Sequence, residues 1–144
     1  MKNRSSKQAL VFLLGFVMIC TLCACGGKAN DVRIEPVESE LYSEKDINAA
    51  IRVIVREFDR GWTGCTLTSI SYAGDETTRA ESEYYLNTLG LYHADELIIL
   101  VSSFDVDETG GDGSLAPNST YEGWKWILIR NNGGRWKHVD HGYG

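Results

Sequence analysis

Cysteine is scarce over most of this 144-residue chain. Three of the four cysteines lie within residues 20–25, which leaves Cys65 alone in the rest of the sequence. A lone cysteine cannot form an internal disulfide, and no group of Cys and His has the spacing of a zinc site. These absences exclude a disulfide framework and a zinc-stapled fold. Cys65 lies in the strand-like stretch GCTLTSISY with no basic residue or His nearby, so we expect a small buried side chain.

Basic residues are in the minority, because 14 Lys and Arg stand against 20 Asp and Glu, a net charge of −6. This balance argues against nucleic acid or anionic lipid as a partner bound through a broad basic surface. The chain also lacks an apolar run suited to a membrane span, which needs about 20 residues. Its uncharged run from Ala9 to Leu22 has 14 residues.

The first 22 residues have the pattern of an export signal. Lys2, Arg4 and Lys7 form a basic start without any acid, and the apolar run of residues 9–22 follows it. A basic n-region followed by an apolar h-region of this length is typical of a secretory signal peptide.

The four residues from Leu22 to Cys25 resemble the bacterial lipobox, with Leu at −3, small residues at −2 and −1, and Cys at +1. The resemblance implies that Cys25 receives a diacylglyceryl group through its sulfur and that the chain is cut just before it. Cysteine supplies the nucleophilic thiolate that this reaction requires. Two lipid chains, at about 0.8 kcal/mol for each buried CH₂, give stable anchoring.

The three neighbouring cysteines have two alternative interpretations besides lipidation. A Cys-x-x-Cys metal or redox pair from Cys20 and Cys23 does not fit, because both lie in the segment expected to be removed. An ordinary cleaved signal with incidental cysteines is the other alternative. We predict a signal peptide at residues 1–24, a lipidated N-terminus and flexible tether at 25–42, and a single domain at 43–144. Removing residues 1–24 takes three basic residues and no acid, so the formal charge falls from −6 to −9.

The pattern of the domain predicts an α+β fold. A helix is expected over residues 44–61, capped by Ser43, and a second over 74–90. Strands are expected at residues 65–73, 94–106, 121–130 and 135–143, with a hairpin turn at NNGG, residues 131–134. The order α-β-α-β-β-β packs most simply as a mainly antiparallel four-stranded sheet with the helices on one face.

That order resembles the cystatin-like roll, as in the nuclear transport factor 2-like superfamily. The motifs GCTLTSISY, GSLAPNSTYEGWKWILIRNNGGRW and the closing HGYG look like an uncharacterised family of lipoproteins from Gram-positive bacteria. The resemblance covers most of residues 43–144. It implies no activity, and it identifies no catalytic residue.

An aspartate-rich loop is a candidate calcium site. Asp105, Asp107, Thr109 and Gly110 form D-x-D-x-T-G, which matches the first half of a calcium loop. Position 12 of that loop is Ala116 instead of the required Glu, although Asp112 can act as a ligand in another geometry. The alternative is a polar hairpin loop, since Asp and Gly are common turn residues.

Two further groups are candidates for ligand binding. On a strand, His138 and Asp140 share a face and can polarise a water or ligate a metal, unless the strand is simply solvated. Trp124, Trp126 and Trp136 can stack on a sugar or a peptide, although aromatic pairs across strands also build cores.

These patterns lead to three hypotheses about function. The first is a non-enzymatic lipoprotein domain, anchored outside the cytoplasmic membrane, that binds an unknown protein or small-molecule ligand. The second is a small enzyme with a pocket between helix and sheet, and the third is a Ca²⁺-dependent envelope module. The sequence lacks a nucleophile–base signature, which favours binding.

Overall fold

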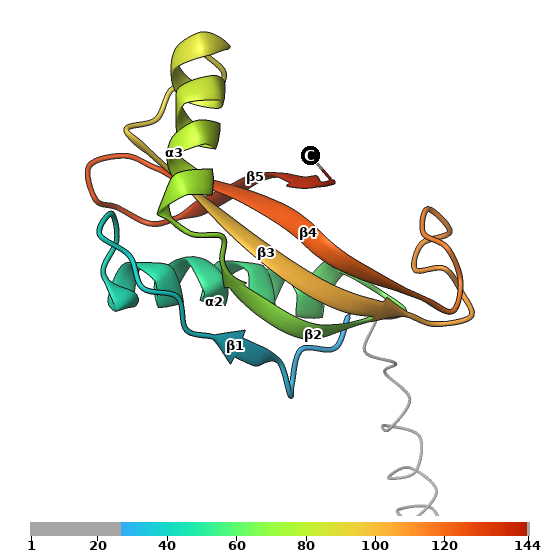
Figure 1. Cartoon of the computed structure of the whole chain (residues 1–144). Helices are drawn as coiled ribbons and strands as arrows, with labels where there is room; N and C mark the ends of the chain where they lie inside the picture. The colour runs from blue at the N-terminus through green and yellow to red at the C-terminus, as the bar shows by residue number, and fades with distance from the viewer. Residues whose placement is uncertain (1–26, 144) are drawn as a thin grey trace, which may run out of the picture.

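The computed structural model describes residues 27–143 of the chain (Figure 1). The predicted signal peptide at residues 1–24 and the predicted lipidation site Cys25 lie outside the described residues.

The long helix α2, Glu44–Gly61, has the bounds that the sequence predicts. It begins at Ser43, whose Oγ accepts a hydrogen bond from the backbone N–H of Asp46 at 3.2 Å. The same hydroxyl donates to the Asp46 carboxylate at 2.6 Å, so a short acid replaces the usual Glu of a capping box. Ile51, Ile54 and Phe58 recur at helical spacing and are at most 2% exposed. Each such side chain contributes about 1.5–3 kcal/mol by leaving water.

The sheet confirms the α+β class and adds a strand to the four that we predicted. Its order is β1-β2-β3-β4-β5, and all neighbours pair antiparallel except β1, which pairs parallel with β2. The sheet is therefore mixed and five-stranded. The strands are β1 Arg33–Glu35, β2 Cys65–Tyr72, β3 Glu96–Val106, β4 Ser119–Arg130 and β5 Lys137–Gly142.

The strand β1 corrects our prediction of a flexible tether at residues 25–42. The described part of that segment, residues 27–42, is attached to the rest of the domain at several points. Ile34 pairs with Ile70, and Lys28 forms an isolated bridge with Thr66. Further on, Ser39 Oγ donates to Asp75 at 2.6 Å. The sequence shows little periodicity here because a three-residue strand is too short to display one.

The helices lie on opposite faces of the sheet, whereas we predicted one face (Figure 1). The core under α2 contains Ile98 and Leu100 of β3. Leu97 and Ile99, which alternate with them, form a second core on the other face, closed by α3, Asp75–Ser82, and the π-helical turn η1, Glu83–Thr88. A central strand that is apolar on both faces needs a cover on both.

A β-bulge shifts the inward face of β2. Cys65 and Leu67 are buried at the start of the strand, but Ile70 and Tyr72 are buried after the irregularity between Leu67 and Ser69. One extra residue reverses the alternation of a strand. The strand therefore keeps its apolar residues on the α2 face even though their spacing changes.

Candidate functional site

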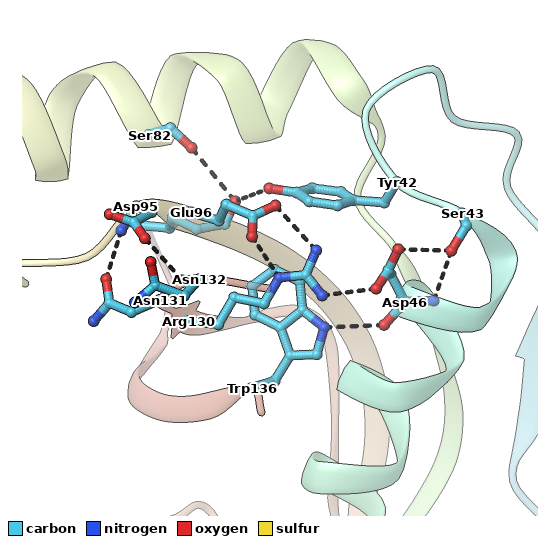
Figure 2. A network of polar contacts seen from close by, with 11 residues as sticks. Tyr42, Ser43, Asp46, Ser82, Asp95, Glu96, Arg130, Asn131, Asn132 and Trp136 are labelled. Carbon is cyan, nitrogen blue, oxygen red and sulfur yellow. Dashed lines mark hydrogen bonds and ion pairs between the residues drawn. The ribbon is translucent and has the colours of Figure 1, made fainter. Parts of the chain in front are cut away.

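The N-terminal end of α2 is tied to the sheet by one arginine (Figure 2). The Arg130 side chain is 10% exposed. It donates two hydrogen bonds to the Glu96 carboxylate, at 2.6 and 3.0 Å, and one to Asp46 Oδ1 at 2.7 Å. A planar guanidinium suits this two-sided pairing, which joins α2, β3 and β4.

Aromatic rings enclose that guanidinium. It lies 4.2 Å from the centroid of the Trp136 ring and 5.8 Å from that of Tyr42. The Trp136 indole N–H donates to the backbone oxygen of Asp46 at 3.1 Å, and the Tyr42 hydroxyl donates to the backbone oxygen of Leu97 at 3.0 Å. We call Arg130, Asp46, Glu96, Trp136 and Tyr42 the arginine clamp.

The pKa shifts of the clamp residues follow from their hydrogen bonds and their burial. The hydrogen bond from Ser43, followed by that from Arg130, lowers the pKa of Asp46. Hydrogen bonding to Glu96 raises the pKa of Arg130, and burial with Glu96 nearby raises that of Tyr42 to about 12. The charged groups of the clamp are paired with one another, so the arrangement suits a structural role. The structure thus places Trp136, one of our candidates for ligand binding, in this buried clamp.

The C-terminal end of α2 is different, because the pocket that it borders, of about 370 Å³, is lined by tryptophan and histidine side chains. The end of the helix supplies Gly61, Trp62 and Thr63, and the pocket also reaches Cys65 at the start of β2. Residues 111–115 of the loop between β3 and β4 contribute Asp112, Ser114 and Leu115, while the strands β4 and β5 contribute Trp124 and His141. We call this site the aromatic pocket.

The rings of the aromatic pocket pack mainly edge to face. Trp62 and Trp124 are half-buried, with ring centroids 5.9 Å apart and planes at 84°. Trp62 stacks on Phe58 of the core at 5.2 Å, and His141 lies 5.2 Å from Trp62. Within residues 27–143, the buried Trp124 indole N–H has no hydrogen-bond partner. This end of the molecule therefore combines partly open aromatic surface with a polar group that is not satisfied.

His141 is linked to an acidic side chain on α2 through a second histidine. Nδ1 of His138 contacts Glu57 Oε2, and Nε2 of His138 lies 3.2 Å from Nδ1 of His141. Because a carboxylate accepts, Nδ1 of His138 carries a proton. When His138 is neutral, its Nε2 accepts from Nδ1–H of His141, and Nε2 of His141 then holds a free lone pair.

Protonation of His138 at Nε2 changes the donor and acceptor roles within this pair. Nε2 of His138 also lies 3.0 Å from the backbone oxygen of Asp140, so a protonated His138 can donate to that oxygen. If His141 were then protonated as well, Nε2 of His138 and Nδ1 of His141 would both carry a proton, and two N–H groups would face each other. A positive charge on His141 is therefore disfavoured. His141 is exposed as a whole residue, but its ring packs against Trp62 and Trp126. This partial burial of the ring, followed by the nearby His138, lowers the pKa of His141.

A bulge explains why the two histidines meet. Our prediction that His138 and Asp140 share a face was wrong, because the register shifts between Ile127 and Leu128 of β4. Leu128 is opposite His138 on the α2 face, whereas Ile127 is opposite Asp140 on the other face. There, burial with Asp140 nearby raises the pKa of Tyr92.

Two remaining side chains belong to the core. Trp126 is fully buried, and its indole N–H donates to Ser102 Oγ at 2.8 Å, so of the three predicted tryptophans Trp124 alone lines the aromatic pocket. Cys65 is 2% exposed, as we expected of a small buried residue. Burial, with Asp107 and Asp112 nearby, raises the pKa of its thiol, which argues against an activated nucleophile.

The aspartates of the candidate calcium loop do not converge. Asp107 accepts from the backbone N–H and the hydroxyl of Thr109, and Asp112 accepts in the same way from Ser114. Asp105 accepts from Thr120 across the hairpin at 2.6 Å. No group of three or more His, Cys, Asp or Glu side chains is placed to hold a metal ion within the described part of the chain.

A larger hollow of about 900 Å³ lies between β1 and the N-terminal half of α2. Its lining includes the apolar side chains of Ile34 and Val37. The hydroxyls of Ser39, Tyr42 and Ser43 also line it, but they are already bonded to Asp75, Leu97 and Asp46. Glu35, Glu38, Glu44 and Asn48 complete the polar part of this lining, which differs from the aromatic pocket in containing neither a tryptophan nor a histidine.

Trp62, His141 and Glu57 were not among our predicted site residues. Trp62 is one of the four tryptophans of the chain, and this residue type is the signal in the sequence that points to it. Comparison with models of protein families, with curated proteins and with solved structures finds no match to this chain. Between residues 27 and 143, no helix has the length and apolarity to span a membrane.

Proposed function

We propose that this protein is a lipid-anchored domain on the outer face of the cytoplasmic membrane, and that it binds a ligand in the aromatic pocket. The lipobox at residues 22–25 supports the anchor. The observation that carries the binding role is the convergence of Trp62, Trp124 and His141 from three elements on one pocket. Concave, partly apolar sites with a few polar groups are where proteins bind small molecules.

The chemistry of the pocket indicates the kind of ligand. Trp62 and Trp124 offer ring surface for an apolar face, such as that of a sugar or an aromatic side chain. His141 and the carboxylate of Asp112 offer hydrogen bonds at the same site. A sugar or a short peptide, free or part of a larger partner, has both properties.

The fold also supports a binding role. One long helix, α2, packs against a sheet of order β1-β2-β3-β4-β5. We propose that this arrangement is a cystatin-like roll, with a rim formed by the end of the helix and the neighbouring loops. In this chain, the loop 107–118 and Trp62 lie at that rim and border the aromatic pocket.

The anchor is tested by Cys25→Ala, with Cys23→Ala as the matched control two residues away. We expect Cys25→Ala to lose the lipid, as read by mass spectrometry, and to leave the membrane fraction. Cys23→Ala keeps a small residue at that position and retains the lipid. Lipid on the Cys25→Ala variant would contradict the proposal.

The pocket is tested with N-acetylglucosamine oligosaccharides and short peptides, using tryptophan fluorescence of the Cys25→Ala protein. We expect Trp62→Ala to lose the binding and Trp136→Phe, at the arginine clamp, to retain it. Binding that survives in Trp62→Ala, or a failure of both classes of probe to bind, would argue against a pocket ligand of this chemistry.

A second candidate function is catalysis, favoured by the chain Glu57–His138–His141. A carboxylate that orients one imidazole, which in turn orients another, can leave His141 as a general base at the pocket. We expect a bound ligand to be converted by the wild type and about 10²–10⁴-fold more slowly by His141→Gln. Recovery of the ligand unchanged from the wild type would exclude this candidate.

A further inference from the structure

We propose that the lipid anchor holds the aromatic-pocket end of the domain close to the membrane surface, with the arginine clamp pointing away from it. This inference rests on the proposed lipidation of Cys25. It concerns which face of the domain meets the headgroup layer and where the ligand of the pocket must be found.

The chain is fixed to the domain almost immediately after the predicted anchor. The Gly27 N–H donates to the backbone oxygen of Phe58 at 3.0 Å, at the end of α2. The Lys28 N–H donates to the oxygen of Cys65 at 2.9 Å, and the Lys28 oxygen accepts from the N–H of Leu67 at 2.8 Å. Three backbone hydrogen bonds thus hold residues 27 and 28 against α2 and β2.

The packing at Gly27 is close. A Cβ atom at this position would lie 2.5 Å from the Phe58 oxygen and 2.8 Å from the Trp62 oxygen. Ala29, two residues later, is buried in the main core. Residue 27 therefore sits directly beside Trp62, which lines the aromatic pocket.

The distance from anchor to domain follows from the covalent reach of the chain. Gly27 is two positions after Cys25, and an extended chain spans at most about 7 Å over two positions. The helix α2 has 18 residues and is about 27 Å long, so the arginine clamp at its other end lies much farther along the domain. A short link at one end brings that end to the membrane.

The net charge of the domain favours an orientation in which the arginine clamp points away from the membrane. With residues 1–24 and their three basic residues removed, the formal charge of the chain is −9, and anionic lipids repel such a domain. The covalent link holds one end close against this repulsion, while the other end is free to move away. The attached end also carries Tyr143, which is 62% exposed and lies 5.2 Å from Trp124 between ring centroids. Tyrosine and tryptophan are the residues that favour the membrane–water interface.

This orientation limits the ligands of the pocket. A site beside Trp62 and Thr63 lies within reach of the headgroup layer, so it meets molecules at the membrane surface before those farther out. The ligand class is then a sugar or a peptide that is itself held at the membrane.

The test uses the mature lipidated protein, which begins at Cys25, in vesicles of phosphatidylcholine and phosphatidylglycerol. A fluorophore is attached at Thr63→Cys or, for comparison, at Asn132→Cys in the β4–β5 turn near the clamp, both exposed positions. The buried Cys65 does not compete for the label. A nitroxide on the lipid headgroup serves as a short-range quencher. We expect at least about twofold stronger quenching at residue 63, given the length of α2.

A spacer provides the control. About 20 Gly and Ser residues inserted between Gly26 and Gly27 have a root-mean-square span of about 25 Å, which should remove most of the difference. Equal quenching at the two positions without the spacer, or stronger quenching at residue 132, would overturn the orientation while leaving the anchor in place. Mass spectrometry of the same samples reports the lipid, and its absence would overturn both.

Discussion

The two ends of α2 contact similar kinds of side chain but have different roles. At the N-terminal end, Arg130 is enclosed by two carboxylates and two aromatic rings, and the indole N–H of Trp136 has a partner. At the C-terminal end, Trp124 has a buried N–H without a described partner, and His141 is exposed. Paired polar groups indicate a role in stability, whereas unpaired ones beside a pocket indicate a role in binding.

This contrast gives the first and largest predicted effect. Arg130→Met leaves the carboxylates of Glu96 and Asp46 without their cation. Because water reaches both carboxylates in part, we expect a loss of about 2–3 kcal/mol in the free energy of unfolding. Chemical denaturation measures it. Arg135→Met, at an exposed arginine nearby, is the matched control and should change little. A loss below about 1 kcal/mol for Arg130→Met would contradict the clamp.

A smaller effect is expected at the ring beneath the guanidinium. Trp136→Phe keeps an aromatic face for Arg130 but removes the hydrogen bond to the Asp46 oxygen. We expect a loss of about 1–2 kcal/mol in the same denaturation experiment. A variant as stable as the wild type would show that this bond contributes nothing.

The clamp should also give the protein a specific sensitivity to acid. The folded state lowers the pKa of Asp46, so the stabilisation from its carboxylate is present above the usual value of 3.8 and is lost as the pH falls through the folded pKa. Asp46→Asn removes this contribution, and we expect its melting temperature to fall less steeply between pH 5 and pH 2. Parallel curves for variant and wild type would contradict this assignment.

The smallest effect on stability is expected at the pocket. Above pH 7, His141→Gln should change the free energy of unfolding by less than about 0.5 kcal/mol, because the side chain is exposed. The folded state lowers the pKa of His141, so the wild type loses stability as the pH falls below 6.5 through the folded pKa, and the variant does not. Glu57, His138 and Asp140 are the ionisable groups that influence this ring. An NMR titration of His141 at or above 6.5 would contradict the geometry.

Local patterns were enough to predict most of the fold. The bounds of α2 follow from the Ser43 cap and the stripe of Ile and Phe, and the turn at residues 131–134 follows from Asn132 and Gly133, both of which adopt positive φ. The strand β1 was missed because its three residues pair with a strand 36 positions away. We did not predict that α3 covers the second face of the sheet, because its short amphipathic pattern does not specify which face of the sheet it packs on.

The site was harder to predict because it depends on register. One irregularity between β4 and β5 brings His141 beside His138 and turns Asp140 to the other face. The contact of Glu57 with His138 joins residues 81 positions apart. No local spacing reports such a contact, and residue type alone did not distinguish Trp124 in the pocket from Trp126 in the core.

The four tryptophans allow the most direct test of the central claim, that the aromatic pocket binds and the clamp stabilises. Each indole N–H gives its own NMR signal, and we propose to follow all four while the Cys25→Ala protein is titrated with N-acetylglucosamine oligosaccharides and with short peptides. We expect the signals of Trp62 and Trp124 to shift, while that of Trp136 stays in place. A shift at Trp136 without one at Trp62 or Trp124 would contradict the account.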